Sequence, residues 1–368
     1  MNYFSVFHGI EQKLKYLFQN NLKPIKNTDS THISDIRKKR KVALDPKTLA
    51  DALQQGDKTA LGRAITLVES NHQKHYGQAN AIIKQCLKHK NKSIRIGITG
   101  VPGVGKSTFI ETLGRSLTSA GHKIAVLTVD PTSTQSRGSI LGDKTRMETL
   151  AKDSNAFIRP SPSGLSLGGV ARKTRESIVL CEAAGYPIIL VETVGVGQNE
   201  TTVHGMVDFF LLLKLAGAGD ELQGIKRGIV EMADAIVINK ADGDNRQKAE
   251  AAKAEFKNAL QLYPPKENGW IPKVLSCSAL KNEGITEIWT MIEQYVKDTR
   301  KSGAYEEKRK QQNEKWLYEA IEERLKSDFF HTGEINKNLK KYTEMVTAKE
   351  ISPFQAAEEL ISIFKTSS

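Results

Sequence analysis

The sequence predicts an α/β protein built on a doubly wound, mostly parallel sheet. Short apolar runs alternate with amphipathic stretches from about residue 93 to residue 296, and this alternation indicates parallel β-α-β units. A glycine-rich turn directly follows the first of these runs and leads into a helical stretch. Acidic and amide residues follow the later runs, and the carboxyl ends of parallel strands are where such sheets bind ligands.

Each predicted strand is short, rich in aliphatic residues and bounded by polar or turn residues. Amphipathic segments such as KSTFIETLGRSLTSAG (106–121) separate the strands and are predicted helices. Residues 93–296 are therefore expected to form the central domain. The predicted strands are IRIGITG (94–100), KIAVLTVD (123–130), YPIILVET (186–193), FFLLLKL (209–215), AIVINKAD (235–242) and PKVLSCSA (272–279).

A basic, helical N-terminal extension is predicted for residues 1–92. The stretch LDPKTLADALQQGD has apolar residues at helical spacing, and its Gly56 and Asp57 are typical of a helix stop and the next N-cap. The net charge of +12 comes mainly from this region, because residues 1–93 hold 17 Lys or Arg and 7 Asp or Glu. The charge peaks at RKKRK (37–41), which suits a nucleic-acid or acidic-membrane contact, a solvated arm or an acidic protein partner. No aromatic residues interleave this run, so nucleic acid is not the favoured partner.

A helical C-terminal extension is predicted for residues 297–368. Leu317, Ile321 and Leu325 recur every four residues in NEKWLYEAIEERLKSDFF and form an apolar stripe. A short helical appendage cannot bury such a stripe alone. The stripe therefore either packs on the protein's own core or belongs to a self-association arm.

The composition indicates a soluble intracellular protein. Hydrophobic residues make up 39% and charged residues 26% of the 368 positions, which is ordinary for a soluble chain. The longest apolar run, around MVDFFLLLKLAG (206–217), is broken by charges and too short to span a bilayer, so no membrane-spanning segment is expected and a membrane is not the favoured partner. Cys86, Cys181 and Cys277 are far apart, which fits a reducing compartment and argues against a cysteine-based metal site.

The glycine-rich turn has the spacing of a phosphate-binding loop. GVPGVGKS (100–107) matches G-x-x-x-x-G-K-[ST] between a predicted strand and a predicted helix, which is the context that the motif requires. Its backbone N–H groups and the helix N-terminus favour phosphate. Lys106 is expected to bridge the terminal phosphates of a nucleotide, and Ser107 to bind Mg²⁺. The expected contacts in the loop are Gly100, Val101, Pro102, Gly103, Val104, Gly105, Lys106, Ser107 and Thr108.

A second motif, INKADGD (238–244), predicts that the base is guanine. An aspartate at the position of Asp242 accepts hydrogen bonds from N1–H and the 2-amino group of guanine. Adenine has no donor at either position and would leave the carboxylate unpaired, which costs binding energy. The expected base contacts are Asn239, Lys240 and Asp242, with Ser278, Ala279 and Leu280 of the later segment CSAL on the other side.

Acidic residues near strand ends predict a metal site. Asp130 ends one predicted strand, Asp143 lies in the loop after it, and Glu192 lies at the end of another. With the Ser107 hydroxyl, these carboxylates form the hard-oxygen set that suits Mg²⁺. Gly195 is placed to offer its N–H to the γ-phosphate and to swing away after hydrolysis. The catalytic candidates at this stage are Lys106, Glu192 and Gly195.

The chain has no glutamine directly after Gly195. In small signalling GTPases a glutamine at that position orients the attacking water. This chain has Val196 there, and the nearest glutamine is Gln198. Slow intrinsic hydrolysis is therefore expected, with a partner or another segment completing the site, which is typical of a switch.

Four longer segments carry a more specific signal. They are VDPTSTQSRGSILGDKTRM (129–147), RPSPSG with LGGVARKTRE (159–176), VETVGVGQNE (191–200) and GAGDELQGIKRGIVEMAD (217–234). Together they resemble the MeaB/ArgK-type (MMAA-like) GTPases, the G-protein chaperones associated with methylmalonyl-CoA mutase. The resemblance runs from about residue 46 to the C-terminus.

The resemblance implies a homodimeric GTPase of the SIMIBI class of P-loop NTPases, which binds GTP or GDP with Mg²⁺ and dimerises through its C-terminal arm. It implies a metallochaperone switch that gates adenosylcobalamin loading into methylmalonyl-CoA mutase, or a related acyl-CoA mutase, and protects that enzyme. GDELQGIK (219–226) resembles the family's third mobile switch, which adds Lys226 to the catalytic candidates. A bacterial cytoplasm is the expected compartment, with the mitochondrial matrix as the alternative.

Two positions depart from the family pattern. Arg137 stands where glycine is usual, and Lys214 stands where apolar or proline residues are usual. Two alternative functions stay open, a P-loop kinase linked to amino-acid transport and a metal-insertion GTPase for another metalloenzyme. The sequence has no second substrate-binding set beside the phosphate loop to support the first. Its dispersed histidines and cysteines do not support the second.

Overall fold

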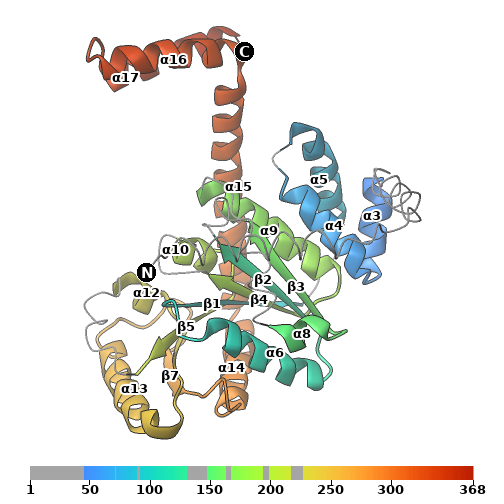
Figure 1. The fold of residues 1–368 in the computed structure, drawn as a ribbon, viewed down its shortest axis with the longest axis vertical. Helices are drawn as coiled ribbons and strands as arrows, with labels where there is room; N and C mark the ends of the chain where they lie inside the picture. Colours follow the sequence, from blue (N-terminus) through green and yellow to red (C-terminus); the bar gives the residue numbers. More distant parts are fainter. Residues whose placement is uncertain are drawn as a thin grey trace, which may run out of the picture. The chain divides into compact units, whose positions relative to one another are not determined.

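A parallel sheet of seven strands forms the centre of the computed structural model (Figure 1). The structure describes residues 45–70, 72–88, 92–130, 147–162, 167–193, 199–216 and 227–367. The chain divides before Pro46, and Pro46–Ser368 form one compact unit. The strand order is β3-β2-β4-β1-β5-β6-β7, and every neighbouring pair is parallel.

All six predicted strands are confirmed, with ends that differ by a few residues. The additional strand is β3, AFIRPSP, which pairs with β2 at the edge of the sheet. Its prolines remove ladder donors, which an edge strand tolerates and a central strand does not. The strands are β1 (Ile94–Gly100), β2 (Ile124–Asp130), β3 (Ala156–Pro162), β4 (Ile188–Thr193), β5 (Phe209–Leu215), β6 (Ala235–Asn239) and β7 (Lys273–Ser276).

Helices cover both faces of the sheet, which confirms the doubly wound α/β class. Alternate residues of each strand, such as Ile96 and Ile98, are buried against one helical layer, as the period of two requires. That layer consists of α6 (Lys106–Ser119), α8 (Glu148–Lys152) and α14 (Ile285–Ser302). The opposite layer consists of α9 (Leu167–Ala183), α10 (Asn199–His204), α12 (Arg227–Met232) and α13 (Arg246–Leu260).

In the described part of the chain, three helices precede the sheet. They are α3 (Pro46–Gln54), α4 (Lys58–Val68) and α5 (Gln73–Cys86), which pack on one another and on α9. The predicted stop and cap between the first two are confirmed. Gly56 has a φ of +88°, and the Asp57 carboxylate accepts hydrogen bonds from the N–H groups of Thr59 and Ala60.

The C-terminal helices α15 (Ala304–His331), α16 (Gly333–Thr347) and α17 (Pro353–Ser367) follow α14. The start of α15 is held by Asp208, a buried residue just before β5. Arg309 donates to both carboxylate oxygens of Asp208, over 2.7 and 2.6 Å. Burial opposes the charged carboxylate, but the hydrogen bonds and charge of Arg309 hold the pKa of Asp208 below its ordinary value. This paired contact anchors the arm to the sheet.

The apolar stripe of α15 is exposed. The exposed fractions are 61% for Leu317, 47% for Ile321 and 60% for Leu325. The interpretation in which the stripe packs on the protein's own core is therefore wrong for these three residues, and self-association remains.

In the part of the chain that the structure describes, no helix has both the length and the apolar character needed to cross a bilayer. The division at residues 92 and 296 stays a prediction, and its second boundary falls within α14.

Candidate functional site

The loop from Gly100 to Gly105 joins the end of β1 to the start of α6. A Cβ at Gly100, where φ is +152°, would lie 2.5 Å from the backbone oxygen of Leu213. At Gly105, where φ is +92°, it would lie 2.8 Å from Asn239 Nδ2. Only glycine fits these two positions. The tight turn leaves the first N–H groups of α6 without helical acceptors, which makes the helix start an anion site.

Lys106 is buried at the start of α6, although lysine is seldom buried without partners. Its Nζ donates to the backbone oxygens of Gly100, at 2.8 Å, and Val101, at 3.3 Å. The ammonium group therefore lies over the loop that is expected to hold phosphates. A nucleotide phosphate would be a stronger acceptor for it than a carbonyl, because charge-assisted hydrogen bonds are the stronger class.

Two members of the predicted metal set lie together. The Ser107 hydroxyl donates to Glu192 Oε1 over 3.3 Å, and Glu192 is buried near the end of β4. A hydroxyl and a carboxylate oxygen at the mouth of a phosphate loop are donors that suit Mg²⁺. Asp130 ends β2, two strands from the loop, and Asp143 lies outside the described residues. Within the described ranges, no three acidic, histidine or cysteine side chains form a metal cluster, so the full set stays a prediction.

The base motif is bonded directly to the phosphate loop. Asn239 Nδ2 donates to the backbone oxygen of Val104 over 2.8 Å, and its Oδ1 accepts from the Ala279 N–H over 3.2 Å. Lys240 Nζ donates to the backbone oxygen of Gly103 over 2.8 Å. Both side chains therefore hold the loop in place. Asn239 uses both polar atoms of its buried amide within the protein, whereas Lys240 is exposed and Asp242 is half-buried, so these two are the motif residues placed to reach a base.

Asp242 is half-buried after β6 and is oriented by a neighbouring loop. Its Oδ2 accepts a hydrogen bond from the Ser278 hydroxyl, and Ser278 Oγ in turn accepts from the Lys281 N–H over 3.2 Å. Leu280, two residues after Ser278, is 81% exposed, so an apolar side chain is available at this edge of the site. A carboxylate with a flanking apolar side chain suits a planar base that carries two N–H donors.

Several predicted residues lie outside the described part of the chain. They are Asp143, Gly195, Val196 and Lys226, as well as Arg137 of the loop after β2. Their roles stay predictions. The other predicted contacts of the loop, Val101, Pro102 and Thr108, are at least partly exposed, while Val104 is buried against the core.

Two polar contacts between distant segments support the site, and no sequence motif predicts them. Thr112 of α6 donates to the backbone oxygen of Ala279 over 2.7 Å, which joins the helix to the base segment. Thr193 donates to Thr99 over 2.9 Å between β4 and β1. Single threonines have no motif, so only the fold brings these pairs together. Cys277 lies nearby, and burial raises the pKa of its thiol to about 12, which disfavours the nucleophilic thiolate.

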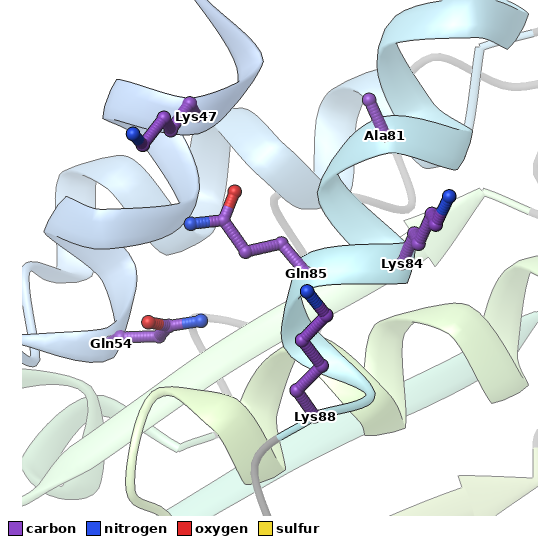
Figure 2. Close-up of a pocket in the computed structure, with 6 residues that line it drawn as sticks. All are labelled: Lys47, Gln54, Ala81, Lys84, Gln85 and Lys88. Atoms are coloured by element: carbon purple, nitrogen blue, oxygen red, sulfur yellow. The ribbon is translucent and has the colours of Figure 1, made fainter.

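A separate groove of about 630 Å³ lies between α3 and α5 (Figure 2). The described lining residues belong to α3, to α5 and to the turn after α5, and none of them carries a carboxylate or a thiol. This groove therefore adds positive surface but lacks the groups that the predicted hydrolysis needs. The lining residues are Lys47, Gln54, Ala81, Lys84, Gln85 and Lys88.

Comparisons with known proteins agree with this geometry. A family model described as Methylmalonyl Co-A mutase-associated GTPase MeaB matches residues 61–334. The GTPase ArgK of Escherichia coli is 43% identical over 326 residues, which cover 88% of this chain and 98% of that protein. The Methylmalonic aciduria type A homolog, mitochondrial, of Mus musculus is 44% identical over 328 residues, which cover 86% of this chain and 79% of that protein. A crystal structure of an LAO/AO transport system kinase has a TM-score of 0.67 and 37% identity, and it covers 87% of this chain and 97% of that one.

Proposed function

Because the chain belongs to the MeaB family of GTPases, we propose that its GTP hydrolysis is a switch that serves a cobalamin enzyme. The switch gates the loading of adenosylcobalamin into methylmalonyl-CoA mutase, or a related acyl-CoA mutase, and protects that enzyme. The mutase is the proposed client because the matching family is described as associated with methylmalonyl-CoA mutase. The proposal that the nucleotide is GTP depends on the contacts of the phosphate loop and the base motif.

One observation carries the nucleotide part. The base motif and the phosphate loop are joined by the contacts of Asn239 with Val104 and of Lys240 with Gly103, each over 2.8 Å. A ligand that fills both ends must carry phosphates and a base at a fixed separation. The Asp242 carboxylate selects guanine, because N1–H and the 2-amino group are the paired donors that it needs.

Each side chain of the site has a separate task in the proposed hydrolysis. Loop N–H groups and Lys106 hold the phosphate oxygens and stabilise the charge that develops on them. Ser107 and Glu192, with Asp130 and Asp143, would hold Mg²⁺, which supplies further stabilisation of the phosphate oxygens when bound. Gly195 offers its N–H to the γ-phosphate. The contact between Ser107 and Glu192 supports the metal part of this scheme.

The proposed switch hydrolyses GTP slowly by itself and faster on its client. Val196 cannot orient the attacking water, since valine has no polar side-chain group. We assign the missing interaction to the segment 219–226, where Lys226 stabilises developing charge after the mutase orders this segment. The resemblance of GDELQGIK to the family's third switch supports this assignment.

Lys226→Ala is expected to keep nucleotide binding and basal GTP turnover while losing most of the acceleration by the mutase. The measurement is GTP turnover with and without a purified adenosylcobalamin-dependent mutase. Lys257→Ala, at an exposed lysine of α13, is the control and should be accelerated like the wild type. Equal acceleration of Lys226→Ala and the wild type would remove Lys226 from the mechanism.

The proposal includes a homodimer formed through the C-terminal arm. The exposed stripe of Leu317, Ile321 and Leu325 supports it, because an apolar helix face left in water favours a partner surface. A monomer in sedimentation at micromolar concentration would contradict this part. The compartment, a bacterial cytoplasm or a mitochondrial matrix, stays a prediction.

A further inference from the structure

Thr128 is a buried polar residue near the end of β2 that no motif identified. Its exposed fraction is 1%, and its hydroxyl makes no hydrogen bond to any atom of the described chain. A buried hydroxyl without a partner loses its hydration and gains nothing in return, which destabilises the folded protein. Such groups are rare in folded proteins and call for a physical reason.

The sheet register places Thr128 beside the candidate metal site. Thr128 is level with Glu192 on the adjacent strand β4, and neighbouring parallel strands are about 4.8 Å apart. Residues level in register point to the same face. Thr128 and Glu192 point to the face of the sheet that α6 covers. Val126 and Leu190, two residues before them on the same strands, are buried in the core against that helix.

Among the described residues, the neighbour of Thr128 on β3 offers its hydroxyl no side-chain partner. On β3 it is level with Pro160, which has no N–H and no polar side-chain atom. Glu192 lies on the opposite side and is in turn 3.3 Å from the Ser107 hydroxyl. The unpaired hydroxyl therefore lies on the strand next to Glu192, which with Ser107 is expected to hold Mg²⁺.

We propose that Thr128 is a positioning residue for the Mg²⁺–GTP complex. Its hydroxyl donates to the Glu192 carboxylate and accepts a hydrogen bond from a water of the metal's hydration shell. The proposal rests on the Mg²⁺–nucleotide site of the proposed function and is independent of any mutase. A hydroxyl that has no hydrogen-bond partner among the described residues is thus satisfied when Mg²⁺ and GTP are bound.

Thr128→Val tests this proposal, because valine has the shape of threonine without the hydroxyl. The first measurement is the Mg²⁺ concentration that gives half-maximal binding of a fluorescent non-hydrolysable GTP analogue. It is expected to rise about fivefold in Thr128→Val, which corresponds to the loss of one net hydrogen bond. Thr128→Ser, which keeps the hydroxyl, should restore the wild-type value.

The second measurement is thermal unfolding, which separates a ligand role from a structural one. Without nucleotide and with EDTA, Thr128→Val should unfold at the same temperature as the wild type or a higher one. With Mg²⁺ and the analogue, it should gain less stability than the wild type. The stabilisation of a protein by a ligand grows with its affinity, so this difference follows from the weaker binding.

Three results would overturn the proposal. One is an unchanged Mg²⁺ requirement in Thr128→Val. Another is an equal loss of nucleotide affinity in Thr128→Val with and without EDTA, which would indicate a general distortion of the site. The third is a wild-type nucleotide affinity that does not depend on Mg²⁺, which would overturn the metal part of the proposed function as well. A failure of the mutase to bind or to accelerate turnover would leave the Thr128 result unaffected.

Discussion

Lys106→Ala is expected to lower GTP turnover by about a hundredfold or more. Removing one preorganised group that stabilises transition-state charge costs that much in well-studied enzymes. Lys106 is buried at the phosphate loop, with its Nζ 2.8 Å from the Gly100 oxygen and 3.3 Å from the Val101 oxygen. The same atom can move onto a phosphate oxygen without a change in the backbone.

The measurement is phosphate release at saturating GTP and Mg²⁺. Because Lys106 also holds two loop carbonyls, thermal unfolding of Lys106→Ala should be compared with that of the wild type to confirm an intact fold. Lys123→Ala, at an exposed lysine beyond the end of α6, is the matched control and should keep wild-type turnover. Near-normal turnover of a folded Lys106→Ala protein would contradict the assignment of the phosphate loop.

Asp242→Asn is expected to weaken GTP binding more than tenfold and to improve the binding of xanthosine triphosphate. The asparagine oxygen still accepts from N1–H, but the amide group faces the 2-amino group of guanine as a second donor. Xanthine has a carbonyl at that position and accepts from the amide. Buried sites that mismatch donors in this way lose about 1–3 kcal/mol for each unsatisfied group.

The measurement is a titration of both nucleotides into the wild type and the variant. The Ser278 hydroxyl that orients Asp242 can also donate to an asparagine oxygen, so the side chain should keep its position. Asp244→Asn is the control, because Asp244 is exposed two residues further along the same turn. Unchanged GTP affinity in Asp242→Asn would remove this carboxylate from the base site.

The sheet could be predicted from the sequence because most of its strands are buried on both faces and read as continuous apolar runs. β3 could not be predicted in the same way. As an edge strand it carries Arg159, Pro160 and Pro162, a composition that local patterns assign to a loop. Gly100, Lys106 and Ser107 were predictable because they follow a spacing rule that describes one local strand–turn–helix geometry.

Contacts between distant segments were not predictable. Asn239 and Lys240 form part of a base motif, but their side chains bind the oxygens of Val104 and Gly103, more than a hundred residues earlier in the chain. Thr128 has no motif at all and is identified only by the register that sets it beside Glu192. Likewise, the periodicity of α15 predicts its apolar stripe, but only packing determines whether that stripe is covered.

The most direct test of the central claim is the affinity of this protein for the proposed client mutase in each nucleotide state. A switch must bind its client differently in the two states, because a ligand shifts an equilibrium only through differential affinity. The measurement is calorimetric titration of a purified adenosylcobalamin-dependent mutase with the protein loaded with a non-hydrolysable GTP analogue or with GDP. For the proposed switch, the dissociation constants in the two nucleotide states are expected to differ by about tenfold or more. Equal constants in the two states, or no binding in either, would contradict it.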